Sequence, residues 1–109
     1  MKKISLLLIL IISQQAFSQH SIKFEESSFA SILAKAKAEK KLVFMDAYAS
    51  WCGPCKLMEK NVFTDKNVAD FYNKNFVNAR IDMEKGEGRD LAIKYGVRSY
   101  PTFLFLNGE

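Results

Sequence analysis

The sequence has 109 residues, of which 49% are hydrophobic and 26% are charged, a composition typical of a globular domain. Its formal net charge is +4, and Lys2 and Lys3 supply two of these charges, which leaves +2 on the remainder. So small an excess argues against a protein that binds nucleic acid or an anionic membrane surface.

Residues 1–18 have the pattern of a cleaved secretory signal peptide. Two lysines form a basic start, residues 4–12 are apolar apart from one serine, and residues 16–18 (Ala-Phe-Ser) offer a cleavage site. A retained membrane anchor is the alternative, but the apolar run is shorter than the roughly 20 residues that a spanning helix needs. We therefore expect a single exported domain over residues 19–109, with no stable membrane insertion after cleavage.

Strands and helices are predicted to alternate along this domain. The pattern indicates a short strand at residues 22–24 and a helix from Phe29 to about Lys40, with Ser27 or Ser28 as its N-cap. The next strand is predicted directly afterwards, at residues 42–47. It is apolar at both alternating sets of positions, which is typical of a central strand covered on both faces.

A second helix is predicted to begin at a pair of cysteines, Cys52 and Cys55. Pro54 is tolerated in its first turn, because its missing N–H would have had no partner there. A third helix should start at Thr64 or Asp65, and it is followed by a predicted strand at residues 76–82.

The last predicted elements are a helix at residues 89–95, which ends at Gly96, and a strand at residues 102–106. The intervening loop at residues 85–88 has no phosphate-binding pattern. Strands that alternate with helices predict an α/β fold with a partly parallel sheet.

The motif Trp-Cys-Gly-Pro-Cys-Lys at residues 51–56 contains the only two cysteines of the sequence. Thiols at this spacing can close into a disulfide and reopen, and a helix N-terminus favours the thiolate that is the nucleophile in disulfide exchange. A structural disulfide is the alternative. So short a loop would contribute only about 2 kcal/mol, against about 3 kcal/mol for a 15-residue loop, so we favour a redox pair.

Other cysteine chemistry is disfavoured. Structural zinc needs about four ligands, and the two cysteines with His20 supply three at most. Haem attachment needs a histidine directly after the second cysteine, where Lys56 stands. We therefore expect no metal site and no cofactor.

Two segments resemble thioredoxins. Residues 43–56, which contain the cysteine motif, resemble their active-site segment, and residues 95–109 resemble the segment that carries their cis-proline. The resemblance runs from about Phe29 to the last residue. It implies a thioredoxin-like three-layer α/β fold with a central mixed sheet.

The end of the sequence departs from that family. Asn107-Gly108 is a strong hairpin signal that should lead into another antiparallel strand, yet only Glu109 follows. A thioredoxin would continue with this strand and a closing helix. We therefore expect a C-terminally incomplete domain that lacks both elements, either a fragment or a chain completed by a partner.

The motif residues are the candidates for catalysis and substrate binding. Cys52, nearest the helix start, should attack the substrate disulfide, and Cys55, one turn deeper, should be the resolving thiol. Gly53 would let a partner's backbone approach, and Pro54 belongs to the same contact surface. Trp51 would flank the thiol, with packing against a strand end as the alternative.

Asp46 lies inside an apolar strand and matches the buried acid of thioredoxins. Burial should raise its pKa and make it an acid and base for Cys55. A strand-end aspartate that reaches solvent is the alternative. Thioredoxins place a lysine on the next strand near this acid; the matching position here is Asn78, with Arg80 close by.

Pro101 follows Tyr100 and precedes the last predicted strand. Only about 5–6% of X–Pro bonds are cis, but the resemblance implies that this one is. In thioredoxins this loop lies beside the thiols, and the backbone of the residue before the proline, here Tyr100, pairs with an extended substrate. A trans proline at the start of an edge strand is the alternative.

The motif and the resemblance together predict a thiol–disulfide oxidoreductase. Its Gly-Pro dipeptide matches reducing thioredoxins, so we expect it to reduce disulfides of exported proteins in a bacterial periplasm. Residues 58–68 also resemble the C-terminal domain of bacterial membrane thiol-disulfide reductases, which suggests a membrane protein as electron donor. The alternatives are a disulfide oxidase or isomerase, and a non-catalytic binding module with the same fold.

Overall fold

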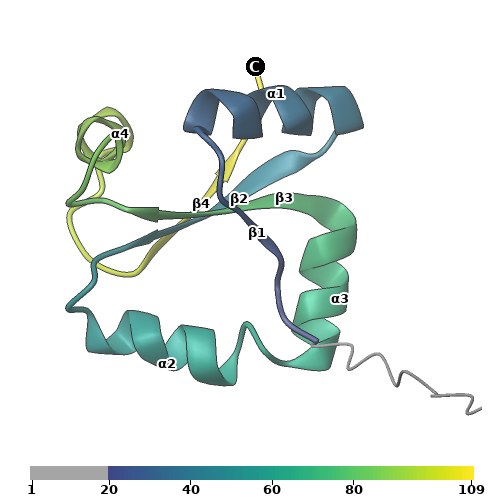
Figure 1. Cartoon of the computed structure of the whole chain (residues 1–109), viewed down its shortest axis with the longest axis horizontal. Helices are drawn as coiled ribbons and strands as arrows, with labels where there is room; N and C mark the ends of the chain where they lie inside the picture. Colours follow the sequence, from purple (N-terminus) through teal and green to yellow (C-terminus); the bar gives the residue numbers. More distant parts are fainter. Residues whose placement is uncertain (1–19) are drawn as a thin grey trace, which may run out of the picture.

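The computed structural model describes residues 20–109, which form a four-stranded mixed sheet with helices on both faces (Figure 1). The expected signal peptide, residues 1–18, and Gln19 lie outside the described residues. The strand order is β1-β3-β2-β4; β1 and β2 run parallel to β3, and β4 runs antiparallel to β2. This confirms the predicted three-layer α/β arrangement.

The elements follow the predicted order closely. The strands are β1 (Phe24–Glu25), β2 (Leu42–Tyr48), β3 (Phe76–Asp82) and β4 (Thr102–Leu106). The helices are α1 (Phe29–Glu39), α2 (Gly53–Asn61), α3 (Lys66–Asn75) and α4 (Gly88–Tyr95). The first strand begins later than predicted, because Ile22 donates its N–H to Phe63 instead of joining the pairing with β3.

Local capping explains where the helices begin and end. Ser28, and not Ser27, caps α1, and Asp65, and not Thr64, caps α3; each side chain accepts a backbone N–H from three residues later. Gly96 ends α4 with a φ of 64°, a left-handed conformation that suits glycine.

Helices α1 and α4 cover one face of the sheet, here called the apolar face (Figure 1). The side chains buried there are hydrophobic. Because side chains alternate along a strand, β2 sends Val43, Met45 and Ala47 to this side. The buried members of the cluster are Phe29, Ile32, Ala36, Val43, Met45, Ala47, Val77, Ala79, Met83 and Leu91.

The opposite face, here called the mixed face, is covered by α2 and α3 (Figure 1). Its buried cluster is centred on Phe44 of β2. The same strands also send Asp46 and Asn78 to this side, and both are buried. Phe103 and Phe105 of β4 contact Phe44 but remain exposed.

The sheet is not closed. β4 is an edge strand, and within residues 20–109 no further strand or helix follows it, as predicted. Among the helices described, none combines the length and the apolar character needed to cross a membrane.

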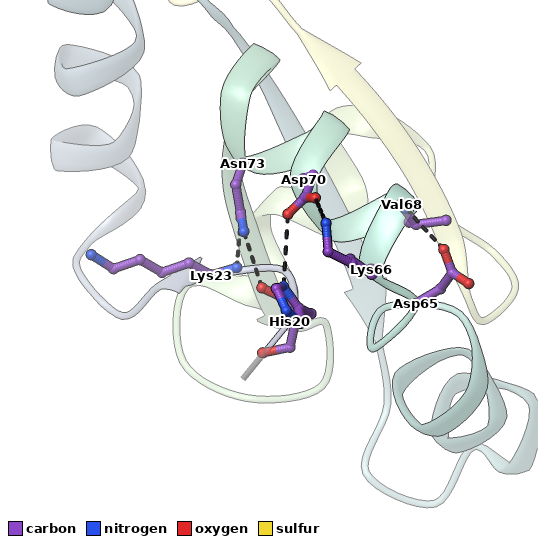
Figure 2. A network of polar contacts seen from close by, with 8 residues as sticks. His20, Lys23, Asp65, Lys66, Val68, Asp70 and Asn73 are labelled. Carbon is purple, nitrogen blue, oxygen red and sulfur yellow. Dashed lines mark hydrogen bonds and ion pairs between the residues drawn. The ribbon is translucent and has the colours of Figure 1, made fainter. Parts of the chain in front are cut away.

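The segment before β1 is tied to α3, as Figure 2 shows. The Lys23 backbone N–H donates to the Asn73 side chain at 2.8 Å, and the Asn73 amide donates to the Ser21 carbonyl at 3.0 Å. His20 Nδ1 lies 4.0 Å from Asp70 Oδ1. The folded domain therefore includes the chain from His20 onward.

Candidate active site

The cysteine pair lies where β2 ends and α2 begins. Cys52 and Cys55 are joined by a disulfide, and Pro54 lies in the first turn of the helix, as predicted. Cys52 is the N-cap of α2, and its sulfur accepts a hydrogen bond from the Cys55 backbone N–H at 3.1 Å. The helix N-terminus thus presents a donor and a positive dipole end to the Cys52 sulfur, an arrangement that favours the thiolate after reduction.

Both cysteines are buried in this oxidised form. Cys52 is 2% exposed and Cys55 is 1% exposed, so exposure alone does not separate the two sulfurs. Their positions do differ, because Cys52 precedes the helix and Cys55 lies within its first turn. Tyr48 and Tyr100 pack against the cluster that the two cysteines form with Ala49.

The residues beside the disulfide are exposed. Trp51 is 68% exposed, so it flanks the cysteines and does not fill the core at the end of β2. Gly53 and Pro54 also lie on the surface. A Cβ at Gly53 would meet no atom within 4 Å, so the space next to Cys52 is open on this side.

Trp51 has a polar partner that the sequence analysis does not identify. Its indole N–H donates to the carboxylate of Glu84, and its ring makes an edge contact with Tyr100 at a centroid distance of 5.9 Å. A signal for Glu84 does exist in the sequence. Trp51 follows β2 and Glu84 follows β3, and the carboxyl ends of neighbouring parallel strands lie at the same edge of a sheet.

The loop before β4, which contains Pro101, lies beside the cysteines. The Tyr100–Pro101 bond is cis, as the resemblance implies. Tyr100 contacts the cysteine cluster, and the Thr102 hydroxyl donates to the Ser99 carbonyl at 2.6 Å across the proline. The structure thus brings Tyr100 and Pro101 together with the motif, although they are far apart in sequence.

Asp46 is buried in the middle of β2, and the alternative of a strand-end residue that reaches solvent is wrong. The residue is 1% exposed, and within the described chain neither carboxylate oxygen has a hydrogen-bond partner. Burial raises the pKa of Asp46 from its usual 3.8 to about 6, partly offset by Arg80, while Glu59 raises it further.

The cation that faces Asp46 is Arg80, and position 78 does not supply one. In the parallel register Asp46 lies opposite Arg80, whereas Phe44 lies opposite Asn78. Arg80 Nε is 3.8 Å from Asp46 Oδ2, while the Asn78 amide donates to the Tyr72 carbonyl at 3.1 Å. Positions 78 and 80 share one face of β3, so the spacing alone does not distinguish them.

Arg80 has two further partners. Its Nη2 forms an ion pair with Glu59 of α2, and its Cζ lies 3.8 Å from the centroid of the Tyr48 ring. Glu59 is not among the site residues predicted from the sequence. It lies four residues after Cys55 in α2, a spacing that places both side chains on the same side of the helix.

Comparison with known proteins shows which family this chain resembles. A family model described as thioredoxin-like matches residues 24–108. Thioredoxin-1 of Drosophila melanogaster is 48% identical over 69 residues, which cover 63% of this chain and 60% of the fly protein. Thioredoxin-1 of Caenorhabditis elegans is 32% identical over 92 residues, or 84% of this chain and 73% of that protein. The chain thus spans less than two thirds of the fly relative's length.

Solved structures agree with the sequence matches. A protein from Bacteroides thetaiotaomicron, provisionally assigned as a disulphide-isomerase, superposes with a TM-score of 0.73 at 53% identity, covering 82% of this chain and 74% of that one. A thioredoxin from Thermus thermophilus gives a TM-score of 0.69 at 29% identity, covering 78% and 64% of the two chains. With the family model matching most of its length and a disulfide-forming Cys-x-x-Cys pair at the start of α2, this chain belongs to the thioredoxin-like family.

Proposed function

We propose that this chain is a thiol–disulfide oxidoreductase that reduces disulfides through the dithiol of Cys52 and Cys55. One observation carries the proposal: the disulfide lies at the N-terminus of α2, in contact with Tyr100 of the cis-proline loop. The open space at Gly53 and the exposed Trp51 border this position. They form a surface on which an extended substrate segment can lie.

The reaction takes two exchange steps. In the reduced protein the Cys52 thiolate attacks one sulfur of the substrate disulfide, which forms a mixed disulfide and releases the first substrate thiolate to be protonated. Cys55 then loses its proton and attacks the Cys52 sulfur. The Cys52–Cys55 disulfide forms, the second substrate thiolate leaves and is protonated, and two electrons have passed to the substrate.

Asp46 is the proposed base for the second step. It lies on the face of β2 that α2 covers, and α2 carries Cys55. With a pKa of about 6, its carboxylate is largely ionised near neutral pH and accepts a proton readily. A base buried beside the helix, where water is excluded, suits a thiol that is itself buried.

The direction of electron flow is supported by the Gly-Pro dipeptide between the cysteines, which thioredoxins share. The provisional assignment of the Bacteroides relative favours the second candidate, a disulfide isomerase that uses the same residues. A non-catalytic binding module is the third.

The proposed setting is the bacterial periplasm, with disulfides of exported proteins as substrates. The basic, apolar and small-residue pattern of residues 1–18 supports export. An exported reductant needs a source of electrons, and we propose a membrane thiol-disulfide reductase for this role. Pulldown of the Cys55→Ser variant from a periplasmic extract tests both partners, because that variant should retain them as mixed disulfides.

The test of activity is reduction of insulin disulfides by the wild-type chain and by Cys52→Ser and Cys55→Ser. We expect Cys52→Ser to reduce no insulin above background and Cys55→Ser to stall as the mixed disulfide. Wild-type turnover by Cys52→Ser would overturn the proposal. No insulin reduction by the wild-type chain, together with unchanged affinity of Cys52→Ser for an oxidised peptide, would indicate a binding module instead. A reduction potential near about −270 mV supports a reductant, and one near about −120 mV supports an oxidase.

A further inference from the structure

Arg80 connects the buried Asp46 to the surface of the mixed face. Its Nε lies 3.8 Å from Asp46 Oδ2, its Nη2 pairs with Glu59, and its Cζ lies 3.8 Å from the Tyr48 ring centroid. The guanidinium is a rigid planar fork. Because the contacts with Glu59 and Tyr48 fix that plane, they also fix where Nε points relative to the carboxylate.

The three charged groups differ in their access to water. The side chain of Asp46 is 1% exposed, whereas those of Arg80 and Glu59 are 32% and 33% exposed. Arg80 and Glu59 also line a pocket of about 230 Å³ that lies between the start of the described chain and the end of α2. The side chains of Glu59 and Arg80 are therefore partly open to solvent, but Glu59 Oε1 and Arg80 Nε are themselves buried, as is the Asp46 carboxylate behind them.

The elements packed around Asp46 present few charges to it. β3 presents Arg80, α2 presents Glu59, and β4 presents the apolar Phe103 directly opposite. Arg80 stabilises the ionised carboxylate, and Glu59 opposes ionisation both by its own charge and by occupying Nη2 of Arg80.

We propose that Glu59 is a positioning residue for the proton step at Asp46, because it holds the Arg80 guanidinium against Tyr48 and so sets how much positive charge faces the carboxylate. This inference rests on the proposed function only in that Asp46 serves as the base for Cys55. The arrangement keeps Arg80 near Asp46 without a hydrogen bond between them. Asp46 can therefore still accept a proton, because no hydrogen bond from Arg80 stabilises its ionised form.

Removing Glu59 and removing Arg80 should shift the titration of Asp46 in opposite directions. Without Glu59, the guanidinium turns toward Asp46 and stabilises its ionised form, so the carboxyl titrates at lower pH and becomes a weaker base. Without Arg80, the buried carboxyl loses the positive charge that faces it and titrates at higher pH. Opposite shifts are expected from these two residues, and the double variant separates positioning from direct charge.

The experiment is a ¹³C NMR titration of the Asp46 carboxyl carbon in the full oxidised chain, for the wild type, Glu59→Gln, Arg80→Gln and the double variant. We expect the midpoint to fall by about one pH unit in Glu59→Gln and to rise by about one unit in Arg80→Gln. The matched control is Glu39→Gln, which removes an exposed carboxylate at the end of α1 and should leave the midpoint unchanged.

The double variant decides whether Glu59 acts through Arg80. If it does, Glu59→Gln shifts the midpoint less in the Arg80→Gln background than in the wild type, because only the part due to its own charge remains. An equal shift in both backgrounds means that Glu59 acts by its charge alone and overturns the positioning role, as does no shift in Glu59→Gln itself. Should Glu59→Gln not fold, Glu59→Asp keeps the charge but shortens the reach; a lowered midpoint supports positioning and an unchanged midpoint contradicts it.

The titration needs no turnover, so its failure is distinct from failure of the proposed function. A wild-type chain that reduces insulin but shows no shift in Glu59→Gln contradicts this inference alone. Where turnover is present, the pH profile of kcat should move in the same direction as the NMR midpoint.

Discussion

The apolar face and the mixed face are built from the same strands, yet they bury different kinds of side chain. On the apolar face, α1 and α4 close over an all-hydrophobic cluster. On the mixed face, Phe44 lies beside the buried Asp46 and Asn78, and two phenylalanines of β4 stay exposed. The alternation of side chains along β2 is what separates the two, because Met45 and Asp46 are neighbours in sequence that point to opposite sides.

This difference separates stability from function. The apolar face gains free energy from burial and holds no charged side chain among its buried members. The mixed face contains a buried carboxylate, Asp46, which lowers stability when it is ionised and is the proposed base for Cys55. Four sets of variants test this division.

On the apolar face, Ile32→Ala should lower the free energy of unfolding by about 2–5 kcal/mol, because it leaves a cavity under α1. The matched control is Ile93→Ala on α4, where the side chain is 82% exposed and the expected change is within about 0.5 kcal/mol. Urea unfolding measures both. Equal losses at the two positions would show that the apolar face is not the main source of stability.

On the mixed face, Asp46→Asn should remove a pH dependence of the free energy of unfolding. The carboxyl has a pKa of about 6 in the folded chain against a usual value of 3.8, so its protonation stabilises the fold at low pH. That contribution is lost as pH rises to about 6, and it amounts to at most about 3 kcal/mol. We expect Asp46→Asn to show no such loss of stability with rising pH, and to be more stable than the wild type above about pH 6.

Urea unfolding across this pH range checks the Asp46 prediction, with the exposed Asp70→Asn as control. In this control, the free energy of unfolding should change with pH as it does in the wild type. A slope that persists in Asp46→Asn would mean that another group carries the pH dependence. Turnover of insulin should fall in Asp46→Asn, because the amide cannot accept the Cys55 proton.

The open edge of the mixed face is tested by two phenylalanines that lie opposite each other, Phe44 on β2 and Phe105 on β4. Phe44→Ala should cost about 3–5 kcal/mol, since the ring is fully buried. Phe105→Ala should cost only about 1 kcal/mol, because about half of that side chain is exposed. A cost at Phe105 as large as that at Phe44 in urea unfolding would indicate that this edge is covered in solution, for example by a second copy of the chain.

The smallest expected effect concerns Glu84→Gln, which weakens the hydrogen bond to Trp51 at the edge of the site. Because Trp51 is exposed and Glu84 is only half-buried, the change in stability should stay below about 1 kcal/mol. Trp51 is the only tryptophan of the chain, so its fluorescence emission reports the loss directly. Glu26→Gln, which changes an exposed carboxylate away from Trp51, should leave the emission unchanged; an equal change in both variants would exclude a specific contact.

Much of the fold is predictable from local sequence patterns. The helix starts at Ser28 and Asp65, the stop at Gly96, and the apolar run of β2 each depend on residues within one turn or one strand. The cysteine pair at the start of α2 is equally local, since spacing and Pro54 suffice to predict it. These signals need no knowledge of the rest of the chain.

The sequence by itself therefore determined the order of elements, the redox pair and the presence of an acid in β2. Only the tertiary structure decided that Arg80 and not Asn78 faces Asp46, that Glu59 holds Arg80, and that Glu84 binds Trp51. The physical reason is distance along the chain: these contacts join residues on separate strands and helices. They depend on strand register and on how a helix is seated on the sheet, which no local pattern specifies.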